Sequence, residues 1–149
     1  MTSLETSVVV RASPERTFEV FTDLARASER VRGIKRIEVL TPGPVGNGTR
    51  FRETRVMFGR EATEEMRIAE FVPGRSFAME ADSCGAFFRT RFEFRGEGGS
   101  TRVTTRMEVE ARSLFAKLMQ PLSKLMMGSM KKAFAADLDD LRKACEAPI

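Results

Sequence analysis

The last third of the chain constrains the fold more than any other stretch. Between Arg112 and Glu146, leucine, methionine and phenylalanine recur at steps of three and four residues, which is typical of a helix with one apolar side. An unbroken helix over this range would be roughly 50 Å long at about 1.5 Å per residue. Such a stripe cannot cover itself, and only candidate strands precede it. The sequence therefore predicts a curved sheet wrapped around one long helix.

The apolar stripe itself indicates that this helix is bent. From Leu114 to Leu138 it advances by four residues at a time, so it drifts by about 40° per step around a straight helix. Pro121 and Gly128 lie within the stripe, and each can bend a helix axis. A bend would either follow the curvature of the sheet or vary the gap beneath the helix like a gate, and both interpretations remain open.

Upstream of the helix, alternating apolar and polar residues predict strands. The first is expected over Leu4–Arg11. It is followed by a helix that begins after Ser13, which can cap it, and by a second short helical piece that ends near Gly33. Six further strands are expected at Ile34–Leu40, Thr49–Phe58, Ala62–Val72, Arg75–Ser83, Ala86–Arg95 and Thr101–Glu110. The turn signals between them favour an antiparallel meander, and hence an α+β fold in one domain over residues 1–149.

Length and cysteine usage indicate the cellular compartment. A chain of 149 residues suits one ordinary domain, and no apolar run approaches the ~20 residues of a membrane span. The first ten residues lack the basic start and the cleavage site of a signal peptide. Cys84 and Cys145 form neither a disulfide framework nor a metal motif. We therefore expect a cytoplasmic protein in which Cys84 is a loop thiol and Cys145 a core residue at a helix end.

Three residue types are missing, and their absence limits the chemistry. The chain has no histidine, tyrosine or tryptophan, which excludes a histidine base, a histidine metal site and a Ser-His-Asp triad within it. We expect neither a metal nor a cofactor. The twelve phenylalanines indicate an apolar interior. The net charge of +4 is dispersed rather than concentrated in a basic stripe, so we expect no nucleic-acid partner.

Four stretches carry a resemblance to a known family. They are the opening VVVRASPERTFEVFTD, the GNGTRFRE strand after a Pro/Gly loop, FVPGRSF between two strands, and the closing amphipathic helix with DLDDLRKACE. Together they resemble the START-like, SRPBCC or helix-grip superfamily, which includes polyketide cyclases, Bet v 1-like proteins and coenzyme Q-binding proteins. The resemblance implies a seven-stranded sheet gripping the C-terminal helix around a hydrophobic cavity for a lipid, sterol, polyketide or aromatic ligand. It implies no shared catalytic signature.

The strand faces then predict which residues line that cavity. The sheet would contribute Phe51, Glu53, Arg55, Met66, Ile68, Phe77, Met79, Phe88, Thr90, Phe92 and Met107, and the helix Leu118, Leu122, Met126 and Met130. A mostly apolar site of roughly 300–1,000 Å³ with few polar anchors is expected. The alternative is that these residues pack together as a solid core.

Glu53 and Arg55 are the polar pair of greatest interest. They share strand parity with Phe51, which aims them inward, whereas the reversed parity would place them in water. Buried together, they would orient a ligand, act as base and electrophile as proposed for aldol-type cyclisation in the cyclases that this chain resembles, or form a structural ion pair.

Three functions follow as hypotheses. The first is the binding or transport of a hydrophobic small molecule, without catalytic residues. The second is a polyketide cyclase or dehydratase-like enzyme that uses Glu53 and Arg55. The third is a protein-interaction domain that acts through its arginine-rich outer sheet face, which includes Arg91 and Arg106. We expect a monomer or homodimer.

Lysines recur every seven residues beside the apolar stripe, at Lys117, Lys124 and Lys131. Basic amphipathic segments can lie on membranes, but here a sheet is available to cover the stripe. We therefore expect solvated lysines and no stable membrane insertion.

Overall fold

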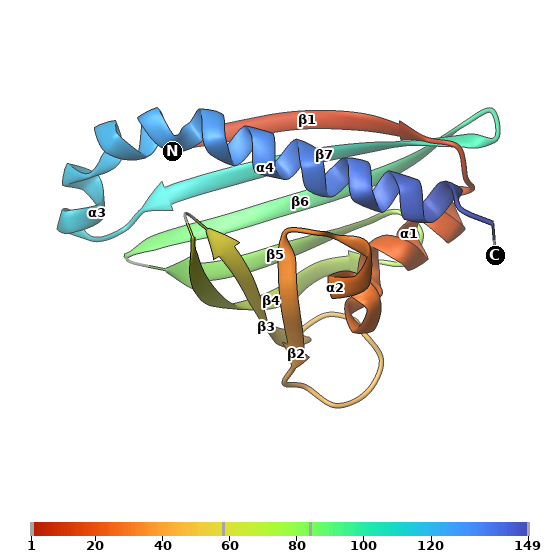
Figure 1. Cartoon of the computed structure of the whole chain (residues 1–149), viewed down its shortest axis with the longest axis horizontal. Helices are drawn as coiled ribbons and strands as arrows, with labels where there is room; N and C mark the ends of the chain where they lie inside the picture. The colour runs from red at the N-terminus through yellow and green to blue at the C-terminus, as the bar shows by residue number, and fades with distance from the viewer. Residues whose placement is uncertain (1, 58, 84, 149) are drawn as a thin grey trace.

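Antiparallel strands form one sheet in the computed structural model of this chain. The structure describes residues 2–57, 59–83 and 85–148, except for the side chains of residues 2, 57 and 120–127. The described strands are β1 (Thr2–Val10), β2 (Ile34–Val39), β3 (Arg50–Met57), β4 (Arg60–Val72), β5 (Ser76–Ser83), β6 (Ala86–Glu97) and β7 (Ser100–Ala111). Their order is β1-β7-β6-β5-β4-β3-β2. The predicted seven-stranded sheet, with six strands in a meander, is confirmed (Figure 1).

Three short helices connect the first two strands. They are α1 (Pro14–Thr22), the 3-10 helix η1 (Leu24–Arg26) and α2 (Ala27–Arg30). Ser13 caps α1, because its Oγ accepts a hydrogen bond from the backbone N–H of Arg16 at 3.2 Å. The proline that follows begins the helix, where a missing N–H costs nothing. The local sequence signals therefore determine where this helical segment begins.

The C-terminal helical stretch is interrupted. It forms α3 (Leu114–Leu118) and α4 (Gln120–Glu146), which are separated at Met119. Pro121 lies in the first turn of α4, where its ring is compatible with a helix start but would disturb a helix interior. The sequence allowed a bend at Pro121 or at Gly128. The structure instead separates two helices just before Pro121 and continues α4 through Gly128, so the apolar stripe does not form one unbroken helix. None of the described helices is long and apolar enough to cross a membrane.

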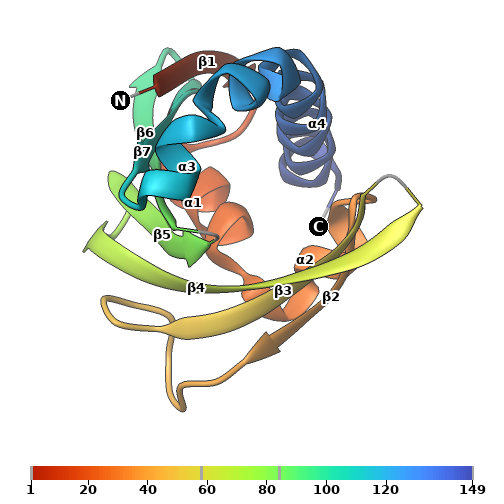
Figure 2. The same cartoon turned by 90° about the vertical axis from the view of Figure 1, so that its left-hand side faces the viewer.

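The sheet curves around the inner face of α4 (Figure 2). Two irregularities contribute to this curvature, because an extra residue in one strand bends it. The register between β4 and β5 shifts between Ala69 and Val72, and Glu70 there adopts a φ of 50°. A second shift lies between Ile34 and Arg36 of β2. The bent half of the sheet thereby stands away from α4, while α4 contacts β1 at the other edge.

A cluster of phenylalanine rings packs the interior beside α1. Phe18 of α1 meets Phe94 of β6 edge-on at 5.2 Å between ring centroids, and Phe77 stacks on Phe92 at 4.6 Å. Such pairs add to the free energy gained by burying apolar area. This end of the molecule is therefore solidly packed.

Gly85 anchors the start of α3 to the turn between β5 and β6. Its carbonyl accepts hydrogen bonds from the backbone N–H groups of Arg112 and Ser113, at 2.8 and 3.0 Å. A Cβ at this position would lie 2.1 Å from Ser113 Oγ, and the φ of 76° also favours glycine. The chain therefore enters α3 at one defined place.

The outer face of the sheet carries arginines paired with carboxylates. Arg89 lies 2.6 Å from Glu80, Arg102 lies 2.8 Å from Glu97, and Arg106 lies 3.5 Å from Glu108. Arg91 pairs with Glu70 at 3.1 Å. Exposed pairs of this kind contribute only about 0–1 kcal/mol each. This face is a ladder of matched charges.

Candidate ligand-binding cavity

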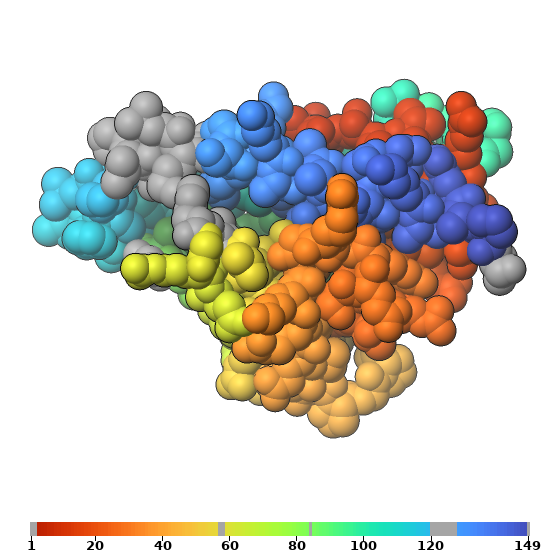
Figure 3. All heavy atoms as spheres, viewed as in Figure 1, coloured from red at the N-terminus to blue at the C-terminus, as the bar shows by residue number. Residues whose placement is uncertain are grey.

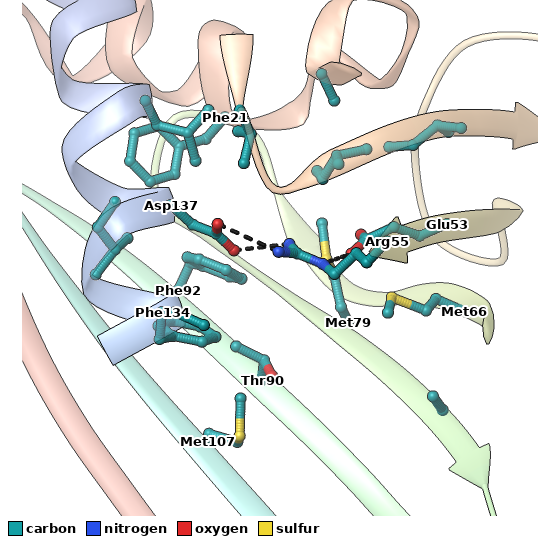
Figure 4. Close-up of a pocket in the computed structure, with 18 of the residues that line it drawn as sticks. Phe21, Glu53, Arg55, Met66, Met79, Thr90, Phe92, Met107, Phe134 and Asp137 are labelled. Atoms are coloured by element: carbon teal, nitrogen blue, oxygen red, sulfur yellow. Dashed lines mark hydrogen bonds and ion pairs between the residues drawn. The ribbon is translucent and has the colours of Figure 1, made fainter. Parts of the chain in front are cut away.

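A cavity of about 450 Å³ lies between the sheet and α4. Its walls come from strands β2 to β7, from the helical segment between β1 and β2, and from α4 between Ser129 and Leu141. Figure 4 shows side chains from these elements converging on one space. The volume falls within the roughly 300–1,000 Å³ typical of small-molecule sites.

Most of the sequence-predicted wall residues line this cavity. They are Phe51, Glu53, Arg55, Met66, Met79, Phe88, Thr90, Phe92, Met107 and Met130. The inward parity of their strands is therefore confirmed, and the alternative of a completely filled core does not hold for this part of the molecule. Whether they contact a ligand remains a prediction.

The structure places three of the predicted wall residues elsewhere. Ile68 and Phe77 are each 1% exposed and belong to the packed core, so the cavity does not reach them. Leu118 is 70% exposed on α3, because the helical stretch is interrupted at Met119 before α4 begins. Their expected places in the wall were wrong.

Four predicted residues fall outside the described part of the structure. The side chains of Leu122, Lys124 and Met126 lie in the range 120–127, and Cys84 is itself among the residues not described. Their predicted places stay predictions.

Further wall residues were not assigned to the cavity from the sequence. Phe21, Leu24 and Val31 close it from the segment between β1 and β2. The apolar side of that helix was recognisable in the sequence, but its position over the open part of the sheet is a tertiary feature.

The polar part of the wall is an ion cluster of Glu53, Arg55 and Asp137. Arg55 Nε donates to Glu53 Oε1, while Nη1 and Nη2 donate to the two carboxylate oxygens of Asp137 at 3.2 and 2.7 Å (Figure 4). The Glu53 side chain is only 8% exposed and that of Asp137 19%. Charge-assisted bonds in this bidentate geometry are strong and directional. The cluster links β3 to α4 across the cavity wall.

Asp137 was missing from the sequence prediction, although a signal for it exists. It lies three residues after Phe134 and four before Leu141, so it occupies the apolar side of its own helix. A charge in such a stripe needs a buried partner, because an unpaired buried charge is very costly. Arg55 lies 82 residues away along the chain, so the sequence alone did not identify it as that partner.

Burial and pairing act against each other on the ionisation of this cluster. Burial by itself lowers the pKa of Arg55, but the hydrogen bonds from its guanidinium to Asp137 and the charges of Glu53 and Asp137 outweigh it. The net pKa of Arg55 lies above its ordinary value, so the guanidinium stays charged. Burial raises the pKa of Asp137 above its ordinary value, although the bonds from Arg55 oppose the rise.

A second pair holds α4 one turn further on. Asp140 accepts a hydrogen bond from the backbone N–H of Arg32 at 3.0 Å and another from its Nη2 at 3.1 Å. Between the two pairs lies Gly33, where a Cβ would stand 3.0 Å from Arg55 Nη1 and 3.4 Å from Asp137 Oδ1. The absence of a side chain at Gly33 leaves space for the Arg55 guanidinium and the Asp137 carboxylate to meet. Figure 3 shows α4 in contact with the segment around α2.

The arrangement places a cluster of three charged side chains in the wall of a mostly apolar space. Arg55 donates three of its five N–H groups to Glu53 and Asp137, so two N–H groups remain for an acceptor atom of a ligand. The carboxylate oxygens can in turn accept hydrogen bonds from a ligand hydroxyl or amine. No group of three or more potential metal ligands gathers anywhere in the described residues.

Comparisons with known proteins agree with this architecture. A family model described as polyketide cyclase / dehydrase and lipid transport matches residues 1–146. Similar solved structures include the Zhui aromatase/cyclase from a Streptomyces species, R1128, with 16% identity, a TM-score of 0.77, and coverage of 97% of this chain and 93% of that chain. A START superfamily protein from Mycobacterium smegmatis has 17% identity, a TM-score of 0.72, and coverage of 91% and 93%.

The protein TTHA0849 from Thermus thermophilus has 19% identity, a TM-score of 0.78, and coverage of 97% of both chains. At such identities these likenesses establish the fold only. No curated protein sequence matches significantly.

A curved antiparallel sheet that grips a C-terminal helix over an apolar cavity defines a START-like protein of the helix-grip class. Within that class, the chain belongs to the polyketide cyclase / dehydrase and lipid transport family.

Proposed function

We propose that this protein binds a hydrophobic small molecule, of the lipid, polyketide or aromatic type, in the cavity between the sheet and α4. The whole chain would act as one ligand-binding domain. The observation that carries the proposal is the apolar cavity of about 450 Å³. Protein interiors are otherwise close-packed, with few voids larger than a water molecule. The description of the family, which includes lipid transport, supports the same function.

The side chains around the cavity suit a ligand of variable shape. Met66, Met79, Met107 and Met130 all contribute to its wall. Methionine is unbranched and polarisable, so it fills irregular gaps and adapts to what it contacts. We expect the site to accept a range of apolar bodies rather than one fixed outline.

A single introduced tryptophan tests the proposal, because the chain has none of its own. Phe88→Trp places the indole in the cavity wall, and Phe115→Trp places it on α3 at a position that is 67% exposed. Both variants are titrated with the neutral dye N-phenyl-1-naphthylamine. We expect saturable energy transfer at one dye per chain that is much stronger from position 88 than from position 115.

Two results would count against binding in the cavity. One is the absence of saturable dye binding to the full chain, together with native mass spectra in which no small molecule co-purifies. The other is equal energy transfer from both positions, which would place the dye on the outer surface near α3.

An enzymatic function is the second candidate, because Glu53 and Arg55 both line the cavity. In a cyclase or dehydratase, Glu53 would act as base and Arg55 would polarise a carbonyl of the substrate. The engagement of Arg55 by two carboxylates favours a structural and binding role instead. The two functions separate in Glu53→Gln, which should abolish cyclisation of a linear polyketone but leave dye binding largely intact.

A further inference from the structure

The charges around the cavity do not balance. Among the described residues that line it, Arg55 is the one cation, and it contacts both Glu53 and Asp137. Two carboxylates against one guanidinium leave one negative charge. Opposite Glu53 in the register of β3 and β4 stands Glu64, a further carboxylate on the same face of the sheet.

The other charges nearby do not offset this excess. Glu80 also borders the cavity, but its carboxylate accepts hydrogen bonds from Arg67 and Arg89 of the outer face. Asp140 is matched by Arg32. The cluster of Glu53, Arg55 and Asp137 therefore sets the sign of the polar end of the cavity.

We propose that this cavity selects apolar ligands that carry a neutral or cationic hydrogen-bond donor, such as a hydroxyl or an amine, over ligands that end in a carboxylate. The proposal rests on the binding function proposed above and specifies the class of its ligand. It distinguishes this site from one in which an unpaired arginine captures an acid.

The physical reason is the low polarity of the surroundings. A ligand carboxylate entering the cavity loses its hydration and meets a guanidinium that two protein carboxylates already neutralise. A ligand hydroxyl or amine can instead donate to the oxygens of Glu53 or Asp137, and hydrogen bonds to an ionised acceptor are stronger than neutral ones. Like charges a few ångströms apart in such an environment should cost at least about tenfold in affinity.

The test compares three compounds that share one alkyl chain and differ in the head group. Decanol, decylamine and decanoate each compete with N-phenyl-1-naphthylamine for the full-length protein near neutral pH. We expect decanol and decylamine to displace the dye at concentrations about tenfold or more below that of decanoate.

Charge variants show whether the cluster causes this order. Asp137→Asn and Glu53→Gln each remove one negative charge, so each should reduce the disadvantage of decanoate relative to decanol by about tenfold. The double variant should favour decanoate, since the charge of Arg55 is then no longer neutralised by its two partners. Asp140→Asn removes the same charge from the same helix outside the cavity and should leave the order unchanged.

The outcomes separate the two proposals. If the dye binds to the unmodified protein and decanoate displaces it as strongly as decanol does, the proposed selectivity is overturned. The proposed binding function then still stands. The selectivity is also overturned if Glu53→Gln and Asp137→Asn both leave the displacement order of the three compounds unchanged. If one of these variants does not fold, the other is sufficient for this test. If neither the dye nor any alkyl compound binds, both proposals fail.

Discussion

Arg55 connects two parts of the protein that are far apart in sequence. Its guanidinium bonds to Glu53 on its own strand and to Asp137 on α4, and Gly33 leaves the space in which these groups meet. The same three charged side chains thus close the wall of the cavity and hold the helix against it. At the scale of single residues, one cluster joins two elements and also supplies the charges of the proposed binding site.

Replacing Arg55 with alanine should reduce the free energy of unfolding by about 3–5 kcal/mol, because two largely buried carboxylates lose their partner. Urea unfolding followed by circular dichroism measures this loss. Arg32→Ala is the matched control. The Arg32 side chain is 80% exposed and its backbone N–H still bonds to Asp140, so we expect a cost of about 1 kcal/mol or less. Equal effects of the two substitutions would contradict the structural role of the cluster.

Cys145 should be unreactive in the folded protein, since burial raises the pKa of its thiol to about 11. In a Cys84→Ser background, a thiol reagent at pH 8 should modify Cys145 much more slowly than in urea. Rapid modification of the native protein would show that this thiol is accessible.

The same shift predicts how stability depends on pH. Between about pH 9 and 11 the folded thiol keeps a proton that the unfolded thiol loses, so stability is lost as pH rises through this window, by about 1–2 kcal/mol. Cys145→Ala should lack this part of the alkaline loss. The difference between the two unfolding profiles across the window isolates the contribution of the thiol.

At the scale of elements, the two capped helices differ in what they support. Ser13 caps α1, whose Phe18 and Phe21 lie in the core, whereas Ser113 caps α3, on which Leu114, Phe115 and Leu118 are exposed. Both serines accept a hydrogen bond from the backbone N–H three residues later. The two ends thus share one local geometry in different tertiary settings.

Ser13→Ala should therefore cost about 1 kcal/mol of global stability, a usual value for a lost cap. Ser113→Ala should cost less than about 0.5 kcal/mol, because fraying of α3 exposes little additional apolar surface. Equilibrium denaturation of both variants gives the comparison. A larger cost at Ser113 would mean that α3 is more strongly coupled to the core than its exposure indicates.

At the scale of the whole molecule, one end of the interior is solid and the other is hollow. The phenylalanine cluster beside α1 fills the first, and the cavity under α4 occupies the second. A ligand that fills the hollow end would restore packing that the protein alone does not achieve. A ligand that binds there as proposed would therefore also stabilise the fold.

A bound ligand should raise the melting temperature by the usual linkage. At a free concentration of about 100 times Kd, the stabilisation is about 2.7 kcal/mol, which corresponds to roughly 5–10 °C for a chain of this size. Decanol and differential scanning calorimetry provide the measurement. Thr90→Phe, which fills part of the cavity, should itself fold and should show a clearly smaller rise. An equal rise in both proteins would place the bound molecule outside the cavity.

Local patterns were sufficient for the order of the elements and for which residues share a strand face. Alternation along β3 placed Phe51, Glu53 and Arg55 on one face, and the turn signals predicted the meander, but the structure decided that this face points inward. The sequence also indicated a bend at Pro121 or Gly128, and the structure has its helix break next to the first of them. These features depend on residues close together in the chain, where periodicity and backbone sterics act directly.

Only the tertiary structure decided which inward residues border empty space. Ile68 and Phe77 have the same pattern as their neighbours in the wall, yet they lie in the packed core, and Leu118 belongs to the apolar stripe but is exposed. It also brought Asp137 to Arg55 and thereby set the charge of the cavity. A void and a buried ion pair both depend on how distant side chains pack against one another, and periodicity along the chain does not contain that information.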